Sequence, residues 1–359
     1  MNPTRRVFLT LPALLAAALL CGCGEEVEPI SEEAELTPEQ AGVVTKGFSW
    51  ELVGPEAGLP AEGLVSIALT PEGLWAAGGG RLYRRSDGRF LPVEDPALPI
   101  PLNRIAFSDG VLWALGRGAA YSSDMGHRWT AAALPPRDGG WTCHGAASLD
   151  NEAYIATDEG LLSAKGFDPA RPVSFTRLEP LMGKDSGYRT VSDVTMTKGS
   201  VWAVSPDKRG YLAQYLRDKG EWIIRASYDP FRRVAASGDY VWVATDGLGI
   251  WRSTNGGESF NEVMNGGAWD RVRGIGLGKG SIWAASEGGA IYYVYATNVW
   301  EHHGVQEGLV DPVMLDCAYD EAANTVYFAT ASGLAVGTKE GPAPAPPETG
   351  ERRPDEELE

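Results

Sequence analysis

The chain is poor in the side chains that most often hold metals or cofactors. Its 359 residues include four cysteines and four histidines. The adjacent His302 and His303 lie in a predicted strand, where neighbouring side chains point to opposite faces and chelate poorly. His144 follows Cys143, but no further Cys or His lies nearby at a zinc-ligand spacing. We therefore expect no metal and no cofactor.

Signature motifs of catalysis are also missing. The sequence contains no serine-centred glycine elbow, no HExxH helix and no phosphate-binding loop. Acidic residues are abundant, with 48 Asp and Glu, but no pair is distinguished by its spacing. The sequence therefore favours a binding protein over an enzyme and leaves an enzyme open.

Positive charge is scarce. The chain has 31 Lys and Arg against 48 Asp and Glu, a formal net charge of −17. Such acidity disfavours nucleic acid and anionic lipid as partners. Part of the excess lies in residues 25–40 and 341–359, which are rich in Glu and Pro, lack apolar periodicity and are predicted to be disordered.

One long apolar run, from Leu11 to Leu20, lies near the N-terminus. It is too short for a bilayer-spanning helix, which needs about 20 apolar residues. It follows Thr4-Arg5-Arg6-Val7-Phe8-Leu9, which resembles a twin-arginine export motif. It ends in Leu20-Cys21-Gly22-Cys23, which resembles a lipobox cleaved before Cys23.

These resemblances imply an exported protein of the cell envelope, lipid-anchored at Cys23 to the outer membrane or on the periplasmic face. We expect a signal peptide over residues 1–22 and an acidic, disordered tether over residues 23–46. The alternative is an uncleaved anchor helix.

A short phrase recurs seven times: an aliphatic residue, then Trp or Tyr, then a small or aliphatic pair. The aromatic positions lie 38 to 48 residues apart, a period typical of propeller blades and solenoids. The copies are Leu74-Trp75-Ala76-Ala77, Leu112-Trp113-Ala114-Leu115, Ala153-Tyr154-Ile155-Ala156, Val201-Trp202-Ala203-Val204, Val241-Trp242-Val243-Ala244, Ile282-Trp283-Ala284-Ala285 and Val326-Tyr327-Phe328-Ala329.

Each repeat predicts four strands. A short apolar strand and a tight turn such as Ser108-Asp109-Gly110 precede the aromatic strand, and two further strands follow it. Four antiparallel strands make one propeller blade. The sequence therefore predicts an all-β, seven-bladed β-propeller.

The ends of the array predict how the ring closes. The seventh repeat has a third strand at Gly333-Leu334-Ala335-Val336 and then runs into a Pro-rich tail. The segment Phe48-Ser49-Trp50-Glu51-Leu52 has fourth-strand character but no repeat of its own. It can complete the seventh blade and remove an open edge. We expect one propeller domain over residues 47–337 and a disordered tail over residues 338–359.

Two family resemblances accompany the repeats. Ser122-Ser123-Asp124-Met125-Gly126-His127-Arg128-Trp129 and Ser253-Thr254-Asn255-Gly256-Gly257-Glu258-Ser259-Phe260 resemble the Asp-box (BNR) hairpins of sortilin-like propellers. Gly58-Leu59-Pro60 and Gly308-Leu309-Val310, with the strands after them, are similar to propeller repeats of two-component regulator sensors. The resemblance implies that the Asp or Asn ties a structural turn by side-chain-to-backbone bonds.

The two cysteines of the predicted propeller are Cys143 and Cys317. An exported protein can form disulfides. These cysteines fall at the innermost strands of the third and seventh blades, across the channel and beyond the roughly 7 Å Cα limit for a bridge. We expect two separate buried thiols.

Basic residues recur at the start of the innermost strands, with aromatic residues in the same loops. Because equivalent positions in repeats lie at equivalent places, they are expected to surround one channel mouth, suited to an anionic group. The candidate ligand-binding residues are Arg104, His144, Arg189, Arg233, Arg271, Arg273, Trp141, Tyr188, Phe231 and Trp269. The alternative is that these arginines pair with loop acids such as Asp193, Asp229 and Asp270 and pin the loops.

We therefore expect a monomeric, membrane-anchored propeller that binds a protein or an anionic glycan as a scaffold or recognition module. One alternative is a glycosidase or lyase with acids at the channel mouth, where carboxylates about 5–9.5 Å apart would be diagnostic. Another is a periplasmic sensor or an assembly factor for a membrane complex. Fold alone does not separate these functions.

Overall fold

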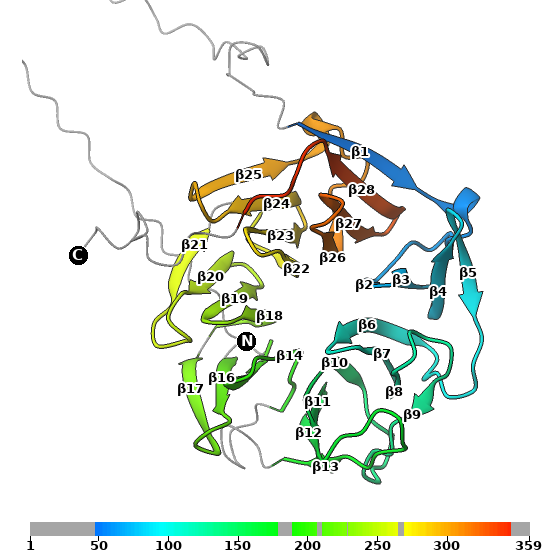
Figure 1. The fold of residues 1–359 in the computed structure, drawn as a ribbon, viewed down its shortest axis with the longest axis vertical. Coiled ribbons are helices and arrows are strands. Elements are labelled where there is room, and N and C mark those ends of the chain that lie inside the picture. Colours follow the sequence, from blue (N-terminus) through cyan, green and yellow to red (C-terminus); the bar gives the residue numbers. More distant parts are fainter. Residues whose placement is uncertain (1–46, 179–188, 207–209, 228, 265–268, 346–359) are drawn as a thin grey trace, which may run out of the picture. The chain divides into compact units, whose positions relative to one another are not determined.

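Seven antiparallel four-stranded sheets surround a central channel (Figure 1). In this computed structural model, the structure describes residues 47–178, 189–206, 210–227, 229–264 and 269–345. In six sheets four consecutive strands pair in sequence order, and the first of them lies innermost. The predicted seven-bladed β-propeller is confirmed.

The strand bounds follow the repeats. Blades 1 and 2 consist of β2 (Ser66–Thr70), β3 (Gly73–Gly78), β4 (Arg81–Ser86) and β5 (Arg89–Val93), then β6 (Leu102–Ser108), β7 (Val111–Gly116), β8 (Gly118–Ser122) and β9 (Thr130–Ala131). Blades 3 and 4 consist of β10 (Cys143–Leu149), β11 (Glu152–Thr157), β12 (Gly160–Lys165) and β13 (Thr176–Arg177), then β14 (Asp193–Met196), β15 (Ser200–Val204), β16 (Tyr211–Leu216) and β17 (Glu221–Ser227). Blades 5 and 6 consist of β18 (Phe231–Ser237), β19 (Tyr240–Thr245), β20 (Ile250–Ser253) and β21 (Asn261–Met264), then β22 (Val272–Leu277), β23 (Ser281–Ser286), β24 (Gly289–Val294) and β25 (Val299–His303). Blade 7 consists of β26 (Met314–Asp320), β27 (Thr325–Thr330), β28 (Gly333–Lys339) and β1 (Phe48–Val53), and two 3₁₀ turns, η1 (Pro55–Ala57) and η3 (Val305–Glu307), lie in loops between blades.

The N-terminal strand closes the ring, as predicted. β1 pairs antiparallel with β28, from Phe48 opposite Lys339 to Val53 opposite Leu334 (Figure 1). Its aromatic rings then pack against the neighbouring blade, because Phe48 and Trp50 lie edge-on to Trp283 at centroid distances of 4.8 and 6.1 Å. The strand therefore fills an edge that would otherwise be open.

The C-terminal segment is ordered further than the sequence predicts. β28 continues to Lys339, two residues beyond the predicted end of the propeller at 337. Asn324 then donates hydrogen bonds from Nδ2 to the carbonyls of Lys339 and Gly341. A Cβ at Gly280 would lie 2.1 Å from the carbonyl oxygen of Pro344, so residues up to this point pack closely against blade 6. The sequence predicted a disordered tail over residues 338–359. Of these residues, the structure describes 338–345 and leaves 346–359 outside the described part.

The recurring aromatic residue forms the contact between successive blades. The second strand of each blade is covered on both faces, so it is apolar throughout rather than alternating. Each tryptophan of the phrase is at most 1% exposed and meets an aromatic ring of the next blade. The pairs are Trp75 with Trp129, Trp113 with Phe175, Trp202 with Phe260, Trp242 with Trp300 and Trp283 with Trp50.

The two turns that resemble Asp-boxes have matching hydrogen bonds. In the first, Asp124 Oδ1 accepts from Ser122 Oγ at 2.8 Å and from the Arg128 backbone N–H at 2.9 Å. In the second, Asn255 Oδ1 accepts from Ser253 Oγ at 2.9 Å and from the Ser259 backbone N–H at 3.1 Å. The Asp124 and Asn255 side chains thus stabilise the turns in which they lie. The Asp124 carboxylate is engaged in this turn and is not arranged as a catalytic acid.

Antiparallel pairing assigns every loop to one of two faces. The innermost strands begin at what we call the entry face, which carries the loops between blades and the turns between second and third strands. The opposite face carries the remaining turns, including both turns that resemble Asp-boxes. Phe48 pairs with Lys339, the last residue of β28, so the chain enters β1 and leaves β28 at the opposite face.

Candidate functional site

Strand register identifies seven equivalent positions at the start of the innermost strands. Each residue pairs with the one that lies two places after the recurring aromatic residue. The seven are Ser66, Arg104, Gly145, Asp193, Arg233, Gly274 and Asp316. We call this set the channel layer. It contains two arginines and two aspartates, so its formal charge is balanced.

Glycines make room for the two aspartates. A Cβ added to Gly145 would lie 2.7 Å from Asp193 Oδ1, and one added to Gly274 would lie 2.9 Å from the Asp316 Cα. In each case the glycine belongs to the blade before the aspartate. The absence of a side chain at Gly145 also lets Arg104 of blade 2 reach past blade 3 to Asp193 of blade 4.

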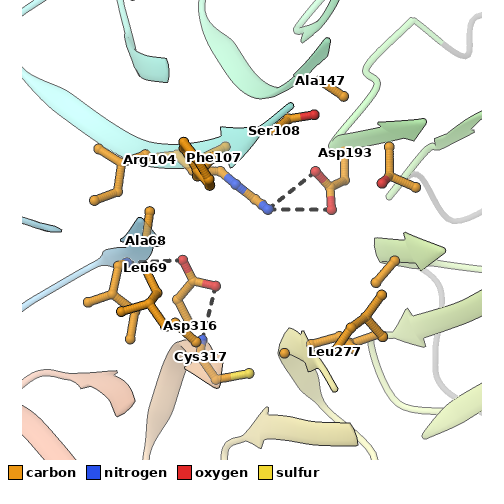
Figure 2. Close-up of a pocket in the computed structure, with 18 of the residues that line it drawn as sticks. Ala68, Leu69, Arg104, Phe107, Ser108, Ala147, Asp193, Leu277, Asp316 and Cys317 are labelled. Carbon is orange, nitrogen blue, oxygen red and sulfur yellow. Dashed lines mark hydrogen bonds and ion pairs between the residues drawn. The ribbon is translucent and has the colours of Figure 1, made fainter. Parts of the chain in front are cut away.

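Arg104 and Asp193 form an ion pair across the channel (Figure 2). Arg104 Nη2 lies 3.3 Å from Asp193 Oδ1, and both side chains are largely buried. Asp193 Oδ2 also accepts from the backbone N–H of Val234, in the next blade. The pair therefore links blades 2, 4 and 5, and its charges are already engaged within the protein.

Asp316 has the same structural role on the other side of the channel. Its Oδ2 accepts from Ser66 Oγ at 2.5 Å and from the Ile67 backbone N–H at 3.2 Å, and its Oδ1 accepts from the backbone N–H of Cys317 (Figure 2). Fixed donors of two blades thus occupy this carboxylate. Neither aspartate is arranged as a free general acid or base.

Arg233 is buried beside this network. Its Nε donates to the carbonyl of Arg273 at 2.8 Å. Burial, with repulsion from Arg104, lowers the pKa of Arg233 to about 10, while Asp193 and Asp316 act in the opposite direction. Arg104 Nε and Nη1 are sealed from solvent and have no hydrogen-bond partner among the described residues.

A cavity of about 330 Å³ lies in the channel next to these residues. Arg104, Asp193 and Asp316 are its charged lining. Apolar side chains line much of the rest, including Leu69, Phe107, Leu277 and Tyr319. Figure 2 shows Phe107 beside the ion pair, Leu69 beside Asp316 and Leu277 across the opening.

The predicted arginine ring does not form, because Arg273 lies ten residues before its tryptophan, whereas Arg104 and Arg233 lie nine before theirs. Arg104 and Arg233 belong to the channel layer, but Arg273 occupies the extra bulge position before Gly274. His144 and Arg232 occupy the same extra position in their blades. Arg273 pairs with Glu287, and Arg232 pairs with Asp246.

The other predicted basic residues are on the rim and are paired. Arg189 contacts Glu159 at 3.3 Å, and Arg271 contacts Glu287 at 3.2 Å; both arginine side chains are 61% exposed. Burial lowers the pKa of His144, Asp158 raises it, and Arg233 and Arg104 lower it further. Local ion pairing therefore explains these residues better than an anion site does.

The predicted aromatic residues do not line a mouth either. Phe231 and Trp141 are core residues, 0% and 6% exposed. Trp141 donates from Nε1 to the Pro135 carbonyl, and Trp269 stacks on His302 at a centroid distance of 4.4 Å. Tyr188 lies outside the described residues. Their repeated place in the loops reflects packing beneath those loops.

Cys143 and Cys317, the two cysteines of the described residues, are unpaired and buried, as predicted. Burial raises the pKa of the Cys143 thiol to about 12 and raises that of Cys317 as well. Within the described ranges, no group of His, Cys, Asp or Glu side chains is suited to a metal ion. Nor does this part of the chain contain a helix long and apolar enough to cross a bilayer.

Sequence reasoning missed four residues of the channel layer that shape it, namely Asp193 as a channel residue, Asp316, Gly145 and Gly274. Asp193 entered only as a possible loop partner of an arginine. Counting nine residues back from the recurring aromatic residue reaches the channel layer in six of the seven blades, and so finds Gly145, Asp193 and Gly274. In blade 7 the longer hairpin between Asp320 and Thr325 places Asp316 eleven residues before Tyr327. The register signal is therefore readable at a fixed offset in every blade except the seventh.

A second feature of the entry face was not predicted. Among the described residues, eight large apolar side chains are exposed, and all are aliphatic. Six of them lie in entry-face loops or turns: Val65, Ile100, Leu248, Val305, Val310 and Val313. Five of these belong to the loops leading into blades 1, 2 and 7, which are neighbours in the ring.

Comparison with known proteins supports the fold. No family model matches the chain, and no curated protein matches it. The extracellular domain of the hybrid two-component system BT3049 from B. thetaiotaomicron matches with a TM-score of 0.61 at 15% identity, over 82% of this chain and 42% of that one. YCF48 from Cyanidioschyzon merolae matches with a TM-score of 0.57 at 15% identity, over 81% of this chain and 98% of that one.

An enzyme is also among the structural neighbours. The GH74 enzyme of Niastella koreensis matches with a TM-score of 0.56 at 18% identity, over 80% of this chain and 44% of that one. The chain thus spans about two fifths of the length of the two-component ectodomain and of the enzyme. At these identities the likenesses show the β-propeller fold alone.

Proposed function

We propose that the protein is an exported, lipid-anchored β-propeller that binds a protein partner through its entry face. One observation carries the proposal: five exposed aliphatic side chains gather on the loops into blades 1, 2 and 7. Apolar patches rimmed by polar residues mark protein interaction sites. An exposed patch costs solubility, so its presence on one face favours a partner there.

The charged side chains of the channel mouth, by contrast, pair mainly with one another and with the backbone, although Arg104 Nε and Nη1 have no hydrogen-bond partner among the described residues. The carboxylates of the mouth accept hydrogen bonds from neighbouring blades, and its arginines bind carboxylates or backbone carbonyls. This pairing favours a structural role for the channel layer. It supports neither an anionic glycan in the mouth nor glycosidase chemistry there.

The neighbours are consistent with recognition. One structure of YCF48 shows that propeller bound to D1 peptide, with a TM-score of 0.57 to this chain at 13% identity. The BT3049 domain is extracellular. By analogy, the present chain would recognise a protein outside the cytoplasm. The turns at Asp124 and Asn255, with the hydrogen bonds described above, support classing it with Asp-box propellers.

Export and anchoring rest on the N-terminal sequence and have a direct test. Cys23→Ala removes the thiol that carries the lipid, so the variant should remain unprocessed or be released from membranes, since a short signal helix is a weak anchor. Mass spectrometry of the mature N-terminus checks this. An unmodified mature start at another residue would contradict the lipoprotein assignment.

Binding is tested by site-specific photo-crosslinking in the cells that produce the protein. A photoreactive residue at position 310, 69% exposed on the entry face, should crosslink to a protein partner. The same residue at position 299, 48% exposed at the start of β25, is the matched control on the opposite face. Absence of an adduct at 310, or equal adducts at both positions, would contradict an entry-face binding role.

A further inference from the structure

We infer that the partner presents a cationic amphipathic segment, with aliphatic side chains flanked by Lys or Arg, to one sector of the entry face. The inference rests on the proposed binding role and specifies its partner. The sector, which we call the apolar arc, consists of Val65, Ile100, Val305, Val310 and Val313. These side chains are between 41% and 69% exposed.

The loops that carry the apolar arc are held in fixed conformations. The loops at η1 and η3 have the same construction. Each ends at a glycine with positive φ, 92° at Gly58 and 99° at Gly308, a conformation that favours glycine. In each, a glutamate accepts a 2.7 Å hydrogen bond from the backbone N–H of the glycine that begins the loop, Glu56 from Gly54 and Glu307 from Gly304.

Contacts between the loops make the arc continuous across three blades. The backbone N–H of Ser332 donates to Asp311 Oδ2, and a Cβ at Gly63 would meet the carbonyl oxygen of Ala331 at 2.0 Å. On the other side, a Cβ at Gly80 would lie 3.0 Å from the Cβ of Pro101. The surface is therefore ordered before a partner arrives, which lowers the entropic cost of binding.

Charge identifies the partner. The loops and turns of the arc carry six carboxylates, none of them in an ion pair in the described structure: Glu56, Glu62, Glu94, Asp95, Glu307 and Asp311. Arg81 and Arg117 are the basic residues of the same segments. In blades 3, 5 and 6, by contrast, entry-face acids such as Asp158, Asp246 and Glu287 are paired with arginines.

The segments of the apolar arc combine exposed aliphatic side chains with an excess of six carboxylates over two arginines, and we call these carboxylates the acidic rim. This combination fits a cationic amphipathic polypeptide. Interfaces of this kind have an apolar centre and a polar rim, and complementary charge directs the encounter. An anionic bilayer would be repelled by the rim. A second copy would place acid against acid, so this surface also disfavours self-association.

Binding of defined peptides to the purified propeller tests the inference. The probe is a short fluorescent amphipathic peptide of Leu and Lys, with two matched peptides in which Glu replaces Lys or Ser replaces Leu. Anisotropy should show tight binding of the Leu/Lys peptide and weak binding of the other two peptides. Added salt should weaken the binding of the Leu/Lys peptide, because it screens the attraction between the lysines and the carboxylates of the acidic rim. Equal binding of the Leu/Glu peptide would overturn the inference.

Paired variants locate the binding. Val305→Ser with Val310→Ser, and separately Glu62→Gln with Glu94→Gln, should each raise the Kd of the Leu/Lys peptide by about tenfold, equivalent to about 1.4 kcal/mol. The control pair, Val299→Ser with Glu258→Gln, removes exposed groups of the same kinds at the opposite face and should leave the Kd unchanged. Equal losses in all three proteins would show general attraction to an acidic surface and overturn the inference.

The crosslinked partner separates this inference from the proposed function. A segment joined to position 310 that is rich in aliphatic residues and Lys or Arg supports both. An acidic or uncharged segment overturns the inference and leaves the binding role standing. No protein adduct at 310 overturns the proposed function, and the inference with it.

Discussion

At the residue scale, the channel layer shows how unequal side chains close a nearly symmetric ring. Two aspartates need space, and glycines in the preceding blades provide it. Arg104 and Asp193 then cross that space. A buried ion pair adds little net stability, but removing one partner costs about 3–5 kcal/mol because the other charge is left uncompensated. The layer therefore restrains the relative positions of the blades more than it strengthens the fold.

The two glycines are expected to be intolerant of alanine for steric reasons alone. Gly145→Ala and Gly274→Ala place a Cβ within 3 Å of a neighbouring aspartate, and each should destabilise the fold by about 1–3 kcal/mol. Gly199→Ala is the control, because nothing lies within 4 Å of its added Cβ. It should be neutral or stabilise by up to about 1 kcal/mol. Urea unfolding of the three variants measures the difference, and equal midpoints would show that the aspartates move aside freely.

His144 should make stability depend on pH. Burial, with Arg233 and Arg104 nearby, lowers its pKa in the folded protein, despite the opposing effect of Asp158. The unfolded chain, with a histidine pKa of about 6.5, then binds a proton that the folded protein does not. Stability should therefore fall as the pH drops below about 6.5. The His144→Gln variant should lose less free energy of unfolding between about pH 7.5 and about pH 5.5; a parallel loss in both proteins would contradict this.

The residue scale is also where sequence reasoning was least successful. Arg104, Arg233 and Arg273 lie nine or ten residues before their tryptophans, and this near-equality predicted one ring. The difference of one residue places Arg273 just before the channel layer, at the bulge position that Arg232 holds in blade 5. Strand pairing and ion pairs form in space, so a count along the chain cannot reveal which arginine meets Glu287 or Asp193.

At the element scale, most of the fold was predictable. The recurring phrase marks the second strand of every blade, because that strand is covered on both sides and must be apolar. Gly-containing turns mark the ends of many strands. Short outer strands such as Thr130–Ala131 and Thr176–Arg177 carry little pattern, so their bounds could not be read from the sequence.

The turns that resemble Asp-boxes should stabilise their hairpins locally. Asp124→Ala and Asn255→Ala each remove the acceptor of two hydrogen bonds and should cost about 0.5–1.5 kcal/mol per bond. Asp218→Ala, at an exposed turn of blade 4, is the control and should change stability by less than about 0.5 kcal/mol. Thermal unfolding distinguishes these outcomes. If the Asp124→Ala and Asn255→Ala variants unfold at the same temperature as the wild-type protein, the two side chains do not stabilise the fold.

The N-terminal strand should be the least dispensable element. Deleting residues 47–53 exposes the edge of β28 and removes Phe48 and Trp50 from Trp283. Phe48 and Trp50 are partly buried, so each contributes less than the ~3–5 kcal/mol of a fully buried Phe or Trp. Together with the lost strand pairing, their removal is still large against the ~5–15 kcal/mol that stabilises a typical domain. We expect this variant to aggregate or to melt far below the full chain.

The matched truncations remove residues 24–46 or 346–359. Both lie outside the described residues and should leave the melting temperature unchanged. A longer C-terminal deletion, from 341, is a poor control because Gly341 accepts a hydrogen bond from Asn324. Equal melting temperatures for all three truncations would show that β1 does not close the ring in solution.

At the scale of the whole molecule, topology relates the proposed anchor to the proposed binding surface. The chain enters β1 at the opposite face, and the apolar arc lies on the entry face. If residues 24–46 form a flexible tether, its root-mean-square length is about 25 Å. A tether of that length permits tumbling but favours orientations in which the opposite face lies nearer the bilayer. The apolar arc would then point away from the membrane, toward proteins outside it.

Energy transfer to a membrane dye tests this orientation. A single cysteine at position 258, in the turn at Asn255, or at position 310 carries the donor on acylated protein in vesicles. The native Cys143 and Cys317 are buried, and burial raises both thiol pKa values, so they should react slowly with the label. Transfer should be stronger from 258 than from 310, and absent from both in the Cys23→Ala protein. Equal transfer from the two positions would show that the tether imposes no orientation, and stronger transfer from 310 would place the apolar arc against the membrane.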